Sequence, residues 1–214
     1  MSDLPVSREA LHARFGAQAF ALGLFYAHEP ALRLELSGEG HRLDRFEQAW
    51  DRAREIADHA LGDSRELVVV LTTFNGDTPR ENGALFRSLR RCGVRMDVPR
   101  AWWLESYQDE WMDQPDPRFY AAFACGREAL HRLLWGALAR EMGVRPRLKG
   151  DLFVADPARG IVLHPYDDRG MDVIGPRNAL LDLYQRFNDR LLDNDRPRMD
   201  AFFASGPGTA PPAA

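Results

Sequence analysis

The chain has 214 residues, of which 45% are hydrophobic and 28% charged, and its net charge is −4. This composition is typical of a globular protein with a sizeable core, and it excludes a disordered or fibrous chain. The acidic balance argues against a protein whose main task is to hold nucleic acid, so nucleic acid is an unfavoured partner. All 28 basic residues are arginine except Lys149, and they are interleaved with acids.

The compartment is predicted from the cysteines and the apolar runs. Cys92 and Cys125 lie far apart without metal-type spacing, which favours two buried thiols in a reducing cytosol. The first residues lack the pattern of a signal peptide, and no apolar run approaches the ~20 residues that span a bilayer. We therefore expect a soluble cytoplasmic protein.

In chain order, residues 6–16 predict a short helix, and the alternation of apolar and polar residues over 31–36 predicts a half-buried strand. Apolar residues then recur every three or four positions over 42–61, which predicts an amphipathic helix ended by Gly62. The apolar run within 66–74 indicates a strand that is covered on both faces.

A third helix is predicted to begin at Thr78, because Thr78-Pro79-Arg80-Glu81 combines an N-cap, a proline at the first helical position and a capping-box glutamate. Gly93 is predicted to end it. Its expected buried stripe consists of Leu85, Phe86, Leu89 and Cys92. The arginines at 87, 90, 91 and 95 could form a basic patch on this helix, but such runs are usually solvated faces.

The second half of the chain predicts strands that are separated by helices. The expected elements are strands at 101–107 and 119–124, a helix at 130–142, a three-stranded meander at 151–155, 160–166 and 171–174, and a long helix at 177–191. The predicted class is α+β, a mixed and largely antiparallel sheet with helices packed on it. Residues 1–203 are predicted to form one globular domain, and 204–214 a disordered tail.

Three segments of the C-terminal part carry a resemblance to a known family. They are the segment from Tyr166 to Asp172, Leu183-Tyr184, and the segment from Asp195 to Asp200. On these segments the chain, from about residue 122 to 203, resembles the bacterial family called domain of unknown function 3885. The family has no established activity, so the resemblance carries over no catalytic residue. Some members occur in contexts similar to polymorphic-toxin loci, which implies a toxin-neutralising role.

An acidic turn joins the last two predicted strands. One interpretation is a tight turn, in which an aspartate binds backbone N–H groups and Gly170 takes a positive φ. The alternative is a divalent metal site for an enzyme, but adjacent aspartates commonly point apart and no second ligand motif accompanies them. The turn is therefore favoured, and we expect no metal or cofactor. Its candidate residues are His164, Tyr166, Asp167, Asp168, Arg169, Gly170 and Asp172.

The stretch from residue 103 to 116 combines acids with aromatic residues. Such a composition is typical of a surface that docks a basic protein, because charge steers the encounter and aromatic rings form hot spots. The structural alternative is that the rings are core and the acids pair with arginines elsewhere. The candidate partner-binding residues are Trp103, Glu105, Tyr107, Asp109, Glu110, Trp111, Asp113 and Asp116.

Several catalytic motifs are missing from the sequence. Lys149 is the only lysine and Arg147 stands two residues before it, which excludes the common Asp…Glu-x-Lys nuclease site. His-Glu-x-x-His, Cys-x-x-Cys, Walker and Gly-x-Ser-x-Gly motifs do not occur either. The leading hypothesis is a non-catalytic cytoplasmic protein that binds another protein, of the kind that neutralises a basic toxin. The alternative is a metal-dependent enzyme that uses the carboxylates of residues 167–172.

Overall fold

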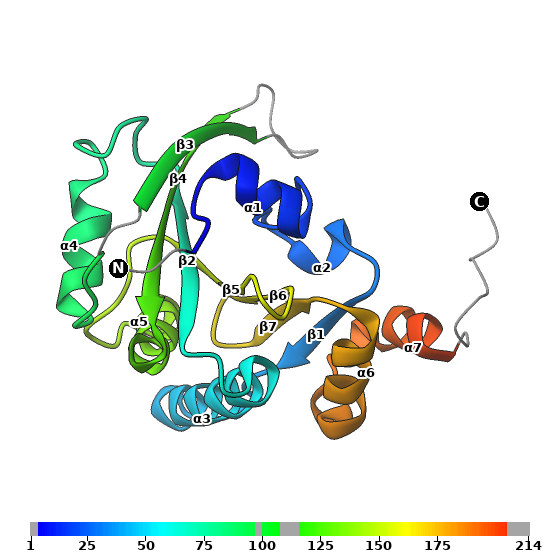
Figure 1. Ribbon diagram of the computed structural model, residues 1–214. Helices are drawn as coiled ribbons and strands as arrows, with labels where there is room; N and C mark the ends of the chain where they lie inside the picture. The colour runs from blue at the N-terminus through cyan, green and yellow to red at the C-terminus, as the bar shows by residue number, and fades with distance from the viewer. Residues whose placement is uncertain (1–3, 97–99, 108–115, 205–214) are drawn as a thin grey trace.

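A computed structural model describes residues 4–96, 100–107 and 116–204, and its centre is one antiparallel sheet. The strand order in this sheet is β1-β7-β6-β5-β2-β4-β3 (Figure 1). The strands are β1 (Ala31–Glu35), β2 (Glu66–Thr73), β3 (Arg100–Tyr107), β4 (Asp116–Gly126), β5 (Asp151–Asp156), β6 (Ile161–Pro165) and β7 (Gly170–Ile174). The α+β class is confirmed, and every pairing between these strands is antiparallel.

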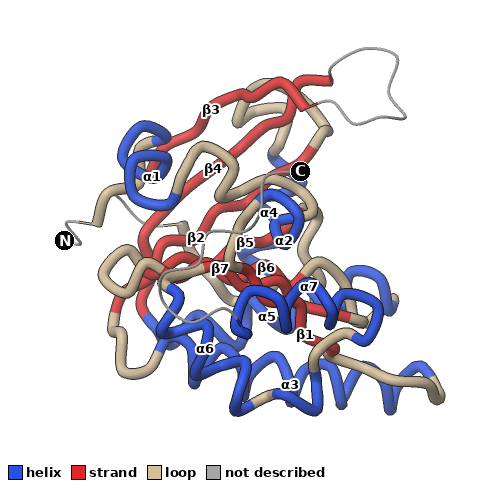
Figure 2. The backbone as a smooth tube through the Cα atoms, turned by 90° about the vertical axis from the view of Figure 1, so that its right-hand side faces the viewer, coloured by secondary structure: helices blue, strands red, loops and turns tan. Residues whose placement is uncertain are grey.

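Helices cover both faces of the sheet. They are α1 (Arg8–Phe15), α2 (Leu24–Ala27), α3 (Arg42–Leu61), α4 (Gly83–Arg91), α5 (Leu130–Met142), α6 (Arg177–Arg186) and α7 (Arg196–Ala204). In Figure 2, α3 runs along one side of the strands and α1 lies on the other. Figure 1 places α4 beside the β2–β4–β3 end of the sheet, and α6 and α7 at the β1 end.

Strand β2 lies inside the sheet, between β4 and β5, and is buried from Leu67 to Thr73. The continuous apolar run predicted this burial, since a strand covered on both faces needs no polar side. The predicted meander is also confirmed, because β5, β6 and β7 are sequential neighbours. The pairing of β1 with β7, which are far apart in the chain, was not predicted.

The two edge strands of the sheet differ in how they are covered. At β1, the backbone N–H of Leu192 donates to the Arg33 carbonyl at 3.1 Å, and Leu34 forms an isolated bridge with Leu191. At the other end, β3 pairs with β4, and no described strand continues the sheet beyond it. A row of exposed backbone groups on an edge strand is a common place for a partner to dock.

Two helix boundaries correct the sequence predictions. The capping-box contacts form, with the Glu81 carboxylate accepting the Thr78 N–H at 3.0 Å, but they close a turn and α4 begins later, at Gly83. At the C-terminal end, α6 stops at Arg186 instead of running to residue 191. Leu191 leaves the helical path because it bridges to β1. Of the predicted tail, residues 204–214, the first residue, Ala204, is helical because it ends α7, and residues 205–214 lie outside the described residues.

The two cysteines are free, with Cys92 buried and Cys125 half-buried. Burial raises the pKa of the Cys92 thiol to about 11 and that of Cys125 to about 12, so both are protonated near neutral pH. Among the described residues, no helix is both long enough and apolar enough to cross a bilayer.

A side-chain contact between α6 and α7 gives a prediction about the C-terminal part. The Tyr184 hydroxyl donates to Asp200 at 2.6 Å, and the Tyr184 ring, half-buried rather than buried, lies 4.8 Å from the Phe203 ring. We expect Tyr184→Phe and Asp200→Ala each to lower the free energy of unfolding by about 1 kcal/mol in urea titrations, since each removes this hydrogen bond. The double variant should cost no more than the larger single effect, and additive costs would contradict the contact.

Candidate functional site

The predicted acidic turn is a closed hairpin loop between β6 and β7. The Tyr166 N–H donates to the Gly170 carbonyl at 3.2 Å. Asp167 accepts the Arg169 N–H at 2.7 Å and also pairs with the Arg169 guanidinium at 2.6 Å. These are the bonds of an aspartate-initiated turn, which supports the structural interpretation. The side chain of Arg169 is 71% exposed, so this pair is a surface contact.

Gly170 corrects one part of that interpretation. It is not among the glycines with positive φ. A Cβ atom at this position would instead stand 2.0 Å from the Tyr166 hydroxyl oxygen and 2.5 Å from Cζ of that ring. Glycine is therefore required by the close approach of the Tyr166 ring and not by the backbone conformation.

The other two aspartates of the turn point to different partners. Asp168 is buried and its carboxylate accepts a hydrogen bond from Arg45, while its carbonyl accepts the Ser37 hydroxyl at 2.9 Å. Asp172 is fully buried on β7 and binds the Arg33 guanidinium through both carboxylate oxygens, at 2.7 and 3.0 Å. Since each carboxylate of the predicted cluster already has its own cation, they do not converge on a common point.

Arg33 is held by aromatic rings as well as by Asp172. Its guanidinium lies 4.6 Å from the Tyr26 ring centroid, 5.0 Å from that of Tyr166 and 5.1 Å from that of Phe25. Burial acts to lower the pKa of Arg33, but the hydrogen bond and charge of Asp172 outweigh it and raise the pKa above its ordinary value. The Arg33 guanidinium therefore keeps its charge, and its two bonds to Asp172 hold β1 against β7.

His164 lies on β6 and is buried beneath the helices. Its ring stacks on Phe153 at 4.1 Å, and Nδ1 lies 2.9 Å from the Leu152 carbonyl oxygen, so Nδ1 carries the proton. Burial lowers the pKa of His164, which keeps the ring neutral. Within residues 4–96, 100–107 and 116–204, no group of three or more His, Cys, Asp or Glu side chains could hold a metal ion.

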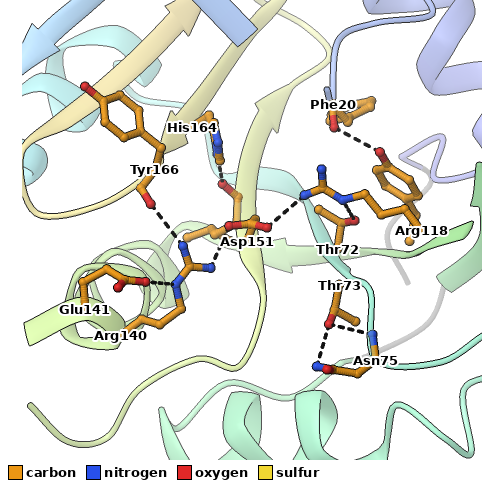
Figure 3. A network of polar contacts seen from close by, with 12 residues as sticks. Phe20, Thr72, Thr73, Asn75, Arg118, Arg140, Glu141, Asp151, His164 and Tyr166 are labelled. Carbon is orange, nitrogen blue, oxygen red and sulfur yellow. Dashed lines mark hydrogen bonds and ion pairs between the residues drawn. The ribbon is translucent and has the colours of Figure 1, made fainter. Parts of the chain in front are cut away.

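A second buried ion network lies at the start of β5 and was not predicted (Figure 3). Asp151 bridges two arginines, Arg118 at 2.9 Å and Arg140 at 2.6 Å. Arg118 is fully buried and also donates to the Thr72 hydroxyl at 2.6 Å, while Arg140 donates to the Tyr166 carbonyl at 3.1 Å. The network ties β2, β4, β5 and α5 together, and its charges are satisfied internally, which is typical of a structural role.

The described part of the acidic aromatic stretch is packed against α1. Trp103 is 8% exposed, and its ring stacks on Tyr120 at 5.3 Å. Glu105 accepts bonds from Arg8 at 2.8 Å and from the Trp103 indole at 3.0 Å. Asp116 is exposed at the start of β4. The 108–115 segment, including the candidates Asp109, Glu110, Trp111 and Asp113, lies outside the described residues, as does the Tyr107 side chain, so their docking role stays a prediction.

The arginine patch that the sequence predicted lies on α4, along two grooves. A groove of about 760 Å³ runs along one flank of α4, between that helix and β3. Its basic lining residues are Arg80, Arg90, Arg95 and Arg100, and its apolar ones include Phe86, Leu89, Met96 and Trp102. A second groove of about 740 Å³ runs along the other flank. Its basic lining residues are Arg87, Arg91, Arg145, Arg147 and Lys149.

We call these basic residues and the two grooves the cationic surface. All of these basic side chains are exposed, and no described acidic residue lines either groove. None of them forms an ion pair within the described part of the chain, although arginines elsewhere commonly do. Helical spacing puts positions 84, 87, 88 and 91 on one flank of α4 and positions 86, 89 and 90 on the other. Helix α4 therefore contributes residues to the lining of both grooves.

Comparison with known proteins gives one match. The family model described as a domain of unknown function, DUF3885, matches residues 8–195. The resemblance predicted for residues 122–203 is therefore confirmed and extends through the N-terminal part, although the match ends at residue 195, before α7 begins. No curated protein and no solved structure matches the chain.

The buried pair of Arg33 and Asp172 gives a stability prediction. We expect Asp172→Asn to lower the free energy of unfolding by about 3–5 kcal/mol in a denaturant titration, because the guanidinium loses its counter-charge inside the protein. Asp189→Asn is the matched control, since that carboxylate is 79% exposed. If the two variants were equally stable, the pair of Arg33 and Asp172 would not be what holds β1 against β7.

The buried ring of His164 gives a pH prediction. Because burial depresses its folded-state pKa, the unfolded chain binds a proton more readily, and stability is lost as pH falls below about 6.5. We expect His164→Phe to lose less stability than the wild type between about pH 7 and about pH 5, measured by urea titration at each pH. Parallel losses in the two proteins would show that His164 does not contribute.

Proposed function

The chain belongs to the DUF3885 family, and we propose that it is a non-catalytic binding protein whose cationic surface holds an anionic partner. The observation that carries this proposal is the charge on both flanks of α4. Four arginines line the first groove, five basic residues line the second, and the described structure gives none of them an acidic partner. An arrangement of like charges costs stability through repulsion, and a bound anion would relieve that repulsion.

The overall charge of the protein contrasts with the charge of the cationic surface. The protein carries a net charge of −4, whereas the two grooves are lined by basic residues and by no described acidic residue, so an anion is attracted to the grooves and not to the protein as a whole. Grooves with low-dielectric walls focus the field, and the apolar side chains of the first groove, Phe86, Leu89 and Met96, supply such walls. An anionic partner is thereby steered to α4.

The sequence-predicted catalytic alternative has less support. Its carboxylates Asp167, Asp168 and Asp172 are each neutralised by a different arginine, which leaves them without a common substrate or metal position. A toxin-neutralising role, which the family resemblance implies, is one form of a binding function and remains a prediction. The basic partner expected from the acidic stretch remains a prediction as well.

Heparin, a polyanion, tests the proposal. We expect the wild-type chain to be retained on a heparin column at low salt despite its acidic net charge, and to elute as the salt concentration rises, since screening weakens the attraction. The double substitution Arg90→Ala with Arg95→Ala should elute at clearly lower salt, because both side chains line the first groove.

The matched control is Arg65→Ala with Arg186→Ala, which removes the same charge from two exposed positions outside the cationic surface. This control should elute with the wild type. If the wild type failed to bind, or if the two double variants eluted together, the cationic surface would not be a binding site. Thermal melts of all three proteins establish that they are folded.

A further inference from the structure

We propose that the partner of the cationic surface is a single-stranded nucleic acid, with phosphates on the arginines and a base stacked on Trp102. This inference rests on the proposed function and names the class of its ligand. It differs from the expectation drawn from net charge, because a sum of −4 over the whole chain does not describe the α4 end of the molecule.

Trp102 provides a stacking platform. It lies on edge strand β3 and is 55% exposed, unlike its neighbour Trp103, which is 8% exposed. The Trp102 ring stacks on the buried ring of Phe119, with centroids 6.2 Å apart and planes 20° from parallel. The Phe119 ring therefore supports the indole by stacking, while Trp102 keeps 55% of its surface exposed to solvent. Every nucleic acid base has a flat face that can stack on such a ring.

The arginines around Trp102 suit a phosphate backbone. Arg80, Arg90, Arg95 and Arg100 line the same groove as the indole. A planar guanidinium can bind two phosphate oxygens at once, which makes arginine the favoured residue for this contact. A groove of about 760 Å³ is also in the range of sites that hold small organic ligands, so it can accept a nucleotide unit.

The second groove indicates a polymer and not a single nucleotide. It lies on the opposite flank of α4 and adds Arg87, Arg91, Arg145, Arg147 and Lys149 without an aromatic side chain. A chain of phosphates crossing α4 would meet cations on both sides of the helix, whereas one nucleotide would occupy the first groove alone. Repeated charge with an aromatic ring at one end is typical of proteins that bind single strands.

Two other anionic partners fit less well. A duplex hides the faces of its bases, so Trp102 could not stack on them and the exposed indole would stay unused. An acidic peptide could pair with the arginines, but it supplies no flat ring for the open face of Trp102. Unpaired bases therefore fit the exposed Trp102 ring best.

The test measures binding of the full chain by fluorescence anisotropy to labelled single-stranded DNA and RNA of about 12 nucleotides, a length typical of such sites. A duplex of the same sequence and a polyglutamate peptide of similar charge are titrated in parallel. We expect the single strands to bind more tightly than the duplex. Their affinity should fall steeply between about 50 mM and about 200 mM salt, because bound phosphates release counterions.

Trp102→Ala should weaken single-strand binding by about tenfold or more, because the stacking contact is lost, while leaving polyglutamate binding unchanged. Leu104→Ala is the matched control, since Leu104 is 42% exposed on the same strand but does not line the groove. Trp102→Leu keeps an apolar side chain over Phe119 and serves if the alanine variant melts early. Arg90→Ala with Arg95→Ala should weaken binding of both the strands and the peptide.

The outcomes separate this inference from the proposed function. If polyglutamate bound and the single strands did not, the nucleic acid would be ruled out while an anionic partner stayed supported. If no probe bound, both proposals would fail. The stacking role of the indole would be overturned if duplex and single strand bound with equal affinity and Trp102→Ala left the affinity for the single strand unchanged.

Discussion

The ion pair between Arg33 and Asp172 is the constraint on which the β1 side of the sheet depends. Both side chains are withdrawn from water, and two hydrogen bonds of 2.7 and 3.0 Å join them across β1 and β7. A charge buried in this way is tolerated only with a fixed partner, so the pair sets the register between the two strands. Asp172 also accepts the Phe25 N–H at 3.0 Å, which fastens α2 over the same strands. The Asp172 carboxylate thus joins β7 to α2 and β1, two neighbouring segments that lie far from β7 in the chain.

Arginine serves two purposes in this protein. In the interior and around the sheet, Arg33, Arg118 and Arg140 act as fixed cross-links, each against an aspartate. Around α4 the same residue type stands exposed without an acidic partner in the described structure. The internal pairs neutralise much of the positive charge elsewhere, so the attraction for an anion is concentrated at one end of the molecule.

The fold places the cationic surface at the β3 end of the sheet. The β1 edge is closed by Leu191, Leu192 and α7, whereas β3 ends the sheet with Trp102 and Leu104 exposed. Helix α4 lies beside that open end and supplies cations to two grooves. Its buried stripe, Leu85 and Leu89, anchors it, so the charged flanks are held by a rigid element.

Local pattern in the sequence determined most of the secondary structure. Periodicity gave α3 over Arg42–Leu61 and α5 over Leu130–Met142, and the turn signals gave the β5–β6–β7 meander. These predictions held because amphipathic spacing and turn residues act over a few positions. The tertiary structure decided what depends on distant segments: the partner of β1, the early end of α6, and the reason for a glycine at 170. The tertiary structure also determined which basic residues come together to form the cationic surface. Net charge and residue order could not show that Arg80, Arg100 and Arg145 gather around one helix, because charge adds over the chain while electrostatic attraction depends on distance in space.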